Sequence, residues 1–234
     1  MKPAIAFGRP WLAMALAAQC ALLFAAGTLG DFTVPGNAMK FVTLMFCAGG
    51  SFVAALHLAE RRAALQPGSF KANTLFWGIA ILCRIAMLGC EPGDDIWRYL
   101  WEGRIQIEGA NPYLLNPAAP ELAPWRDVNW PRINHPDFAA VYPPATEFLF
   151  KGIAFFSPTV LAFKLVFVAA DLLTIALLVR LCANGLADAA WYAWNPAVIY
   201  AFAGGGHYDS VMLLGMTASL LVLHRATRGG AALP

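Results

Sequence analysis

Charge is scarce in this sequence. Lysine, arginine, aspartate and glutamate together make up only 13% of the 234 residues, and the formal net charge is +2. So small a positive excess gives no reason to expect nucleic acid as a partner. Hydrophobic residues make up 59% of the chain, compared with roughly 45–50% in an ordinary soluble domain. This composition is typical of a membrane protein.

Recognisable cysteine motifs and repeats are also missing. The five cysteines form no CxxC pair and lie in or beside apolar runs. Their spacing therefore supports neither a zinc site nor a disulfide framework, and we interpret them as structural thiols. No internal repeat or low-complexity tract is visible in the sequence.

Six apolar runs dominate the chain. The first, 11–29, is long enough to cross a hydrocarbon core of about 30 Å at about 1.5 Å per helical residue, and the other five are similar apolar runs. We therefore predict an all-α fold, a polytopic transmembrane helical bundle forming one membrane-embedded domain. The predicted spans cover residues 11–29, 41–59, 74–89, 160–179, 189–204 and 211–223.

Basic residues predict the orientation of the bundle. They precede the first span and fill the link between the second and the third, so the positive-inside rule places both segments in the cytoplasm. The segment after the third span is then extracytoplasmic. Residues 1–27 also have features of a secretory signal peptide, but the apolar run is long for one and further spans follow. The basic residues are Lys2, Arg9, Arg61, Arg62 and Lys71.

The segment 90–143 differs in composition from the rest of the chain. It holds eight of the fourteen acidic residues, half of the sixteen prolines and four tryptophans. A loop of this length is functional or disordered in most compact proteins, and its aromatic content argues against disorder. We predict a folded extracytoplasmic layer at the lipid headgroups, where tryptophan is enriched.

One amphipathic helix is predicted inside this loop. Asp94 or Asp95 would cap its N-terminus, and Gly109 would end it after Glu108. Its tryptophan-edged apolar face is typical of a helix that lies along the membrane interface. Asp95 and Tyr99 share the opposite, polar face and would point away from lipid.

The next helical stretch, 145–156, is too short to cross a membrane comfortably and contains Glu147 and Lys151. We interpret it as a re-entrant helix that dips into the membrane without spanning it. The turn 204–210, with the sequence GGGHYDS, then lies on the outer side. The alternative, in which 145–156 spans the membrane, stays open and reverses the side of everything that follows.

The acidic pair in the loop suggests chemistry. A carboxylate at such a place can act as a general base on a hydroxyl, although Asp94 and Asp95 could equally be a solvated helix cap. A guanidinium forks onto phosphate oxygens, so Arg84, Arg98 and Arg104 are candidates to bind a phosphate. Arg84 lies inside a predicted span, where an ionisable residue is a functional hypothesis by default; snorkelling to the interface is its alternative.

Three segments together resemble a known family. They are DDIWRYLWEGRIQIEGANPY (94–113), INHPDFAAVYPP (133–144) and WNPAVIYAFAGGGHYDS (194–210). In this order they resemble the bacterial polyprenol-phosphate-mannose-dependent mannosyltransferases, integral-membrane glycosyltransferases of the GT-C type. The resemblance covers roughly residues 84–210.

The resemblance implies a reaction and a site. An acidic residue of the first large extracytoplasmic loop would act as base while a hexose, mannose by resemblance, passes with inversion from a polyprenyl-phosphate-linked sugar to a glycan or glycolipid acceptor. The base would be Asp95, with Asp94 as its neighbour. No cofactor is implied, and a single Asp-Asp pair gives no support for a divalent cation. The residues placed around the substrates are Arg98, Tyr99, Asn111, Tyr113, His135, Tyr142, His207 and Asp209.

Two other functions remain open. Members of the family usually continue through several more spans, so we expect this chain to be incomplete at its C-terminus, and a non-catalytic subunit or remnant is one alternative. A transporter or flippase is the other, with Arg84 and Asp171 along its path. We instead expect Asp171, in mid-span, to pair with another polar group in the bundle. No inverted repeat or matched pair of broken helices favours a transporter.

Overall fold

The structure is a computed structural model that describes residues 9–61 and 63–228. Two basic residues used to predict the orientation, Lys2 and Arg62, lie outside that part. Over the described ranges helices are the only regular secondary structure, with 71% helix and no strand. The predicted all-α fold is confirmed.

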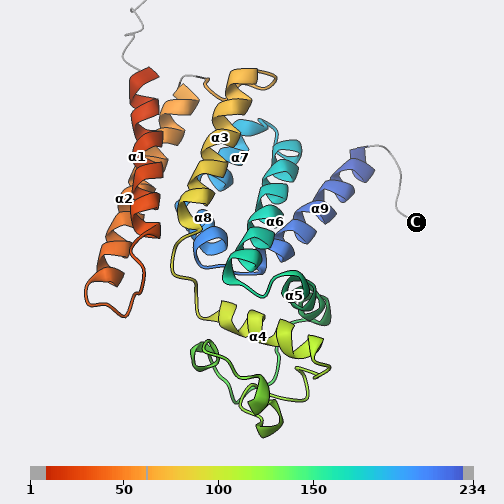
Figure 1. Ribbon diagram of the computed structural model, residues 1–234. Coiled ribbons are helices and arrows are strands. Elements are labelled where there is room, and N and C mark those ends of the chain that lie inside the picture. Colours follow the sequence, from red (N-terminus) through yellow and green to blue (C-terminus); the bar gives the residue numbers. More distant parts are fainter. Residues whose placement is uncertain (1–8, 62, 229–234) are drawn as a thin grey trace, which may run out of the picture.

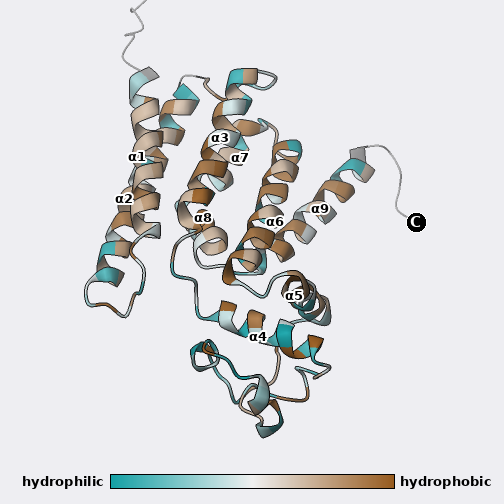
Figure 2. Ribbon diagram, viewed as in Figure 1, coloured by the Kyte–Doolittle hydropathy of each residue, from teal (hydrophilic) through white to brown (hydrophobic). Residues whose placement is uncertain are grey.

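Five helices are long and apolar enough to cross a membrane, and hydrophobic residues line their length (Figure 2). They correspond to five of the six predicted spans, so the chain is an integral membrane protein. The helices are α1 (Arg9–Gly27), α2 (Asn37–Arg61), α3 (Phe70–Met87), α6 (Val160–Leu181) and α9 (Asp209–Arg228).

The predicted span 189–204 differs from a single helix. The chain forms α7 (Leu186–Ala193), breaks, and continues as α8 (Pro196–Ile199) and the π-helical turn η3 (Tyr200–Gly204). Proline has no N–H to donate, and it disfavours helical geometry in the residue before it. The break therefore falls before Pro196, where the side chain of Asn195 accepts a hydrogen bond of 2.9 Å from the N–H of Ala197.

Helices α1, α2 and α3 alternate in direction, α6 and α9 both run away from the loop 90–143, and this loop lies at one end of the bundle (Figure 1). One contact places the turn 204–210 at this same end: the Gly93 N–H donates to the Gly205 carbonyl at 2.9 Å. A second contact places the start of α6 there, because Lys164 donates to the carbonyl of Cys90 at 2.7 Å. The interpretation of 145–156 as a re-entrant helix requires the turn 204–210 and the loop 90–143 to lie at the same end. The side of the membrane that this end faces remains a prediction.

Two shorter helices lie across the loop end of the bundle (Figure 1). They are α4 (Asp95–Ile107) and α5 (Pro144–Phe156), and the segment between them holds the 3-10 turns η1 (Pro120–Trp125) and η2 (Trp130–Arg132). The predicted bounds of α4 are correct, because Gly109 takes the left-handed conformation at φ +87° that ends a helix. Asp94 occupies the N-cap position, but its side chain makes no capping hydrogen bond there.

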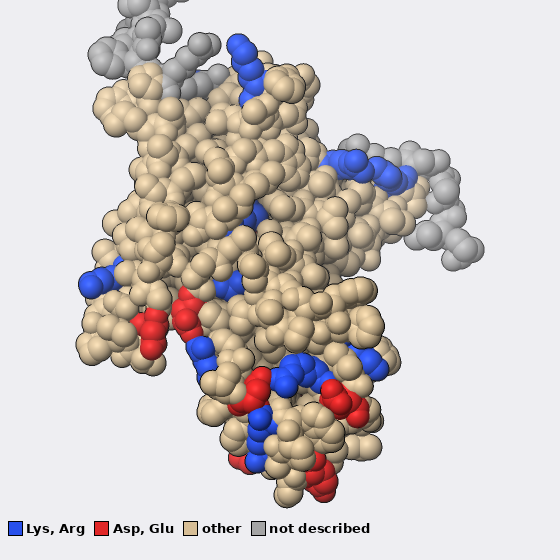
Figure 3. All heavy atoms as spheres, viewed as in Figure 1, with Lys and Arg blue, Asp and Glu red and all other residues tan. Residues whose placement is uncertain are grey.

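The surroundings of α4 differ from the expected interfacial arrangement. Trp97 and Trp101 are buried, at 8% and 2% exposure, rather than turned to lipid. The polar face is covered as well, because Tyr99 and Glu102 are each only 1% exposed. Helix α4 is therefore enclosed between α5 and the loop, while charged side chains gather on the outside of the loop end (Figure 3).

Candidate active site

The centre of the candidate site is a carboxylate beside an imidazole. Asp95 is the first residue of α4, and His207 belongs to the turn between η3 and α9. Asp95 Oδ2 lies 3.7 Å from His207 Nδ1, and both side chains are about one-third exposed, at 36% and 35%. The pair is thus held by the fold and open to a substrate.

Glycines make room for this imidazole. A Cβ added at Gly93 would lie 3.4 Å from the His207 ring, and one added at Gly205 would lie 3.0 Å from it. Gly206, at φ +74°, adopts a backbone conformation that side chains disfavour, and its own Cβ would meet Ile96 at 2.6 Å. The three consecutive glycines of the 204–210 turn therefore let it pass close against α4 and carry His207 to Asp95.

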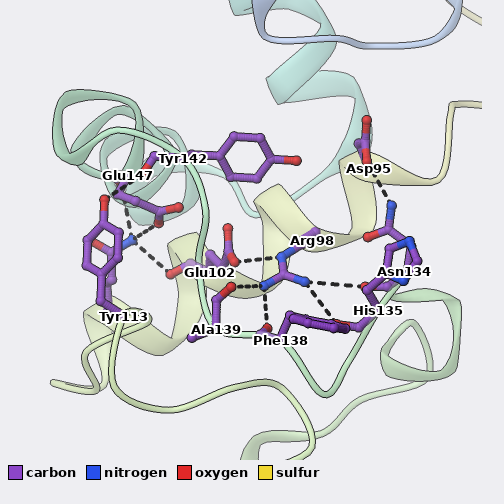
Figure 4. Close-up of polar contacts among 11 residues, drawn as sticks. Asp95, Arg98, Glu102, Tyr113, Asn134, His135, Phe138, Ala139, Tyr142 and Glu147 are labelled. Carbon is purple, nitrogen blue, oxygen red and sulfur yellow. Dashed lines mark hydrogen bonds and ion pairs between the residues drawn. The ribbon is translucent and has the colours of Figure 1, made fainter.

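A third polar group, Asn134, was not selected from the sequence. Its side-chain amide donates hydrogen bonds to Asp95 Oδ1 at 2.8 Å and to Asp94 Oδ2 at 3.3 Å. The amide thus holds one oxygen of Asp95 (Figure 4), while the other oxygen lies 3.7 Å from His207 Nδ1. Asn134 lies within one of the three segments that carry the family resemblance, which was the available signal.

An aromatic cluster lies next to the pair. Tyr99 stacks on Phe150 at 4.5 Å between ring centroids, and its edge contacts Tyr142 at 5.3 Å and Tyr208 at 5.8 Å. Burial, reinforced by the charge of Asp95, raises the pKa of Tyr99 and Tyr142 far above its ordinary value. These phenols therefore stay protonated and can donate hydrogen bonds. Of the predicted site residues, Tyr99 and Tyr142 are brought to Asp95.

The three arginines expected to meet a phosphate are engaged by the chain itself. Arg84, 1% exposed, donates to Asp171 at 2.5 Å and to the Ala193 carbonyl at 2.9 Å. The expectation that Asp171 pairs within the bundle is confirmed, and the structure gives Arg84 a structural role instead of a place at the site. Arg104 pairs with Asp127.

Arg98 is also enclosed. Its side chain is 4% exposed, and all three nitrogens donate to oxygens of the chain. Arg98 therefore binds Glu102 and the carbonyls of the loop, rather than facing the space beside Asp95 as the sequence had suggested. A different guanidinium, that of Arg132, remains 45% exposed, paired with Glu91 and stacked 3.7 Å over the ring of Trp97.

Asn111 and Tyr113 lie at the other end of α4. Asn111 closes a turn by accepting from the Tyr113 N–H at 2.9 Å, and the Tyr113 hydroxyl donates to the Tyr142 carbonyl at 2.6 Å. Both residues line a cleft of about 300 Å³. Eleven residues separate Asp95 from Gln106, which lines the same cleft, so at about 1.5 Å per residue the cleft lies about 16 Å along the helix.

The remaining predicted residues are near the pair but contribute differently. His135 is exposed and adopts φ +48°, and its carbonyl, rather than its imidazole, contacts Arg98 at 3.1 Å. Asp209 begins α9 two residues after His207. Burial, and then the charge of Asp209, raises the pKa of Tyr208. In the described part of the chain no three His, Cys, Asp or Glu side chains are grouped closely enough to hold a metal ion.

The carboxylate of Asp95 can accept a proton at the end of the bundle of apolar helices. An exposed carboxylate fixed on one oxygen by an amide leaves its other oxygen for a hydroxyl, and the imidazole beside it can orient that carboxylate or pass the proton on. Aromatic faces next to the carboxylate can pack against a sugar ring. These groups are the ones needed to transfer a sugar to a hydroxyl while a general base removes the proton of that hydroxyl.

Comparison with known proteins identifies the family. A family model for the N-terminal domain of alpha-(1->6)-mannopyranosyltransferases, the MptA_B family, matches residues 5–233, nearly the whole chain. No curated protein and no solved structure matches the chain. The family implied by the three sequence segments is thus confirmed, and the chain belongs to the MptA_B family of mannosyltransferases.

Proposed function

We propose that the chain provides the catalytic site for transfer of a mannosyl residue from a polyprenyl-phosphate-linked sugar to a hydroxyl of a glycan or glycolipid acceptor. The family name indicates an α-(1→6) linkage. The single observation that carries the proposal is the partly exposed Asp95, held by Asn134 and facing His207 at the loop end of a membrane protein.

In this reaction Asp95 takes the proton from the acceptor hydroxyl as its oxygen attacks the anomeric carbon. The bond between that carbon and the phosphate oxygen breaks, and polyprenyl phosphate leaves with the bonding electrons. A single displacement inverts the anomeric centre and needs no covalent sugar intermediate. The phenol of Tyr142 and the imidazole of His207 border the sugar, the buried Tyr99 packs behind Tyr142, and Arg132 meets the phosphate.

The site would lie on the extracytoplasmic side of a bacterial plasma membrane, with the long prenyl chain of the donor in the bilayer. Basic residues at the other end of the bundle support this side, because Arg61, Lys71, Arg180 and Arg225 all lie away from the loop. Val128 in the loop is 88% exposed. In a cysteine-free chain, Val128→Cys should react with a membrane-impermeant maleimide on intact cells, and Gln66→Cys should not. The opposite pattern would place the site in the cytosol.

The transferase itself is tested by Asp95→Asn in membranes that contain the full chain, labelled polyprenyl-phosphate mannose and a mannan acceptor. Loss of the base should lower transfer by about 10²–10⁴-fold. Asp137→Asn removes an exposed acid elsewhere in the loop and serves as control. Equal transfer by Asp95→Asn and the wild type, at equal protein levels, refutes the proposal.

The structure offers no particular support for a transporter. The two charged residues that would line its path, Arg84 and Asp171, are paired with each other and 1% and 0% exposed. Both are therefore committed to the interior of the bundle.

A further inference from the structure

A row of buried polar side chains runs along α4 behind Asp95. Arg98 lies about one turn from Asp95, and Glu102 follows one turn later. Arg98 Nε donates to Glu102 Oε1 at 2.8 Å, and both side chains are nearly inaccessible, at 4% and 2% exposure. So complete a burial of charge is costly unless every group has a partner. The contacts at the two ends of this row show what the buried charges hold together (Figure 4).

At the end near Asp95, Arg98 fixes the loop that carries Asn134. Its two terminal nitrogens donate to four successive or near-successive carbonyls, at distances from 2.6 to 3.4 Å. A guanidinium can do this because its five N–H groups form a rigid fork. The segment held in this way begins at the residue whose amide binds Asp95. The four carbonyls belong to Asn134, His135, Phe138 and Ala139.

At the other end, Glu102 meets a second acid, Glu147 of α5. In the described part of the chain, Glu102 Oε2 and Glu147 Oε1 are both buried without a hydrogen-bond partner, and the two carboxyl groups are close enough for each to shift the pKa of the other. A hydrogen bond between two carboxyl groups requires one proton. Burial, and then the charge of Glu102, raises the pKa of Glu147 to about 9.

The remaining contacts decide which acid carries the proton. Glu102 accepts from the positively charged Arg98, whereas Glu147 Oε2 accepts only from the neutral amide of Gln106, at 2.9 Å. The charge therefore belongs on Glu102 and the proton on Glu147. Besides Arg98, the titratable groups near this pair are the neutral phenols of Tyr113 and Tyr142, whose pKa the acids help to raise, and the exposed Lys151, which lines the same cleft as Glu147.

We propose that Arg98, Glu102 and Glu147 form a positioning network, holding one negative charge and one shared proton, that docks α4 on α5 and sets Asn134 against Asp95. None of the three is a catalytic residue, since each acts through Asn134. The consequence for transfer rests on the proposed function. The protonation pattern of the network does not.

The two acids should differ in how strongly their replacement by glutamine lowers kcat. Glu147→Gln replaces a neutral acid by a neutral amide that can still donate to Glu102 and accept from Gln106, so kcat should stay within about threefold of the wild type. Glu102→Gln leaves Arg98 charged and unpaired in a buried place and should lower kcat by about tenfold to 100-fold with little change in KM. Glu108→Gln, at the exposed end of the same helix, is the control.

Arg98→Lys extends this test. An ammonium group offers three donors at a single point and cannot span four carbonyls and a carboxylate. Conservation of charge should therefore fail to rescue the site, and Arg98→Lys should lose about as much kcat as Arg98→Ala. Equal losses for Glu102→Gln and Glu147→Gln, a failure of Glu147→Gln to fold, or near-normal transfer by Arg98→Lys would each overturn the proposal.

Stability against pH gives a readout that needs no transferase activity. The pKa of Glu147 is about 9 in the folded chain, compared with 4.5 ordinarily. The contribution of Glu147 to the free energy of unfolding is complete below pH 4.5 and is lost progressively as the pH rises to about 9. It is lost because the unfolded chain releases this proton at a lower pH than the folded chain does. The wild type should thus become less heat-stable over this window relative to Glu147→Gln in detergent. Identical pH profiles refute the network. If this difference appears while Asp95→Asn leaves transfer intact, only the proposed function fails.

Discussion

His207 Nδ1 lies 3.7 Å from Asp95 Oδ2, although the two residues are 112 positions apart in the chain. The distance is longer than a hydrogen bond, so the two groups are adjacent without being locked together. An acceptor hydroxyl or a water molecule can therefore reach the carboxylate. Asn134 orients the proposed base by its hydrogen bond of 2.8 Å, and His207 lies beside the oxygen of Asp95 that Asn134 leaves free.

Replacing His207 should impair transfer without unfolding the chain. His207→Ala leaves one oxygen of Asp95 without its neighbour, and a loss of orientation can cost up to about 100-fold in rate. The loss should appear in kcat, measured with saturating donor in membranes. His224→Ala, near the far end of α9, is a matched control. A His207→Ala chain with wild-type kcat would remove His207 from the site.

Arg132 should contribute to donor binding rather than to the rate of transfer. Its guanidinium is 45% exposed and can exchange Glu91 for a phosphate. Arg132→Ala is expected to raise the donor KM by about tenfold or more, the effect of losing one charged hydrogen bond worth about 1.5–3 kcal/mol. Arg126→Ala, which removes a loop guanidinium bound to the Ala118 and Ala119 carbonyls, controls for loss of charge. An unchanged donor KM in Arg132→Ala would contradict this assignment.

Gly103 permits the close approach of α4 and α5. A Cβ at this position would lie 2.6 Å from the Phe150 carbonyl oxygen and 2.9 Å from the Ala154 Cβ. Gly103→Ala should therefore destabilise the chain by about 1–3 kcal/mol through overpacking. Thermal unfolding in detergent measures this effect.

Gly152 on α5 provides the opposite control. A Cβ there meets nothing within 4 Å, so Gly152→Ala should be neutral or should stabilise the helix by about 0.5–1 kcal/mol. If both glycines respond alike to alanine, the contact between α4 and α5 differs from the one described.

The buried pair of Arg84 and Asp171 should matter for stability only. Removing one partner, as in Asp171→Asn, leaves a buried charge uncompensated and should cost about 3–5 kcal/mol. The double variant Arg84→Met with Asp171→Leu should recover most of that loss, since apolar replacements of a buried ion pair are often neutral. Thermal unfolding of the single and double variants decides this. A double variant that is stable but transports or transfers nothing would return the pair to the functional site.

Local pattern sufficed for much of the fold. Long apolar runs dictate helices wherever the backbone must satisfy its own hydrogen bonds in lipid, so five spans were predictable. The bounds of α4 were equally local, set by the acids at its start and by Gly109 at its end. The break in the predicted span 189–204 was missed, although its cause is also local, because Pro196 acts on its immediate neighbours.

The sequence by itself thus determined the class of protein, the helical layout and the segment that carries Asp95. Only the tertiary structure decided which groups meet. It brought His207 and Asn134 to Asp95, buried Arg84 and Arg98 in ion pairs, and brought Glu102 close enough to Glu147 to raise its pKa. Such contacts depend on how three segments, far apart in the chain, pack against one another, and no local spacing records that.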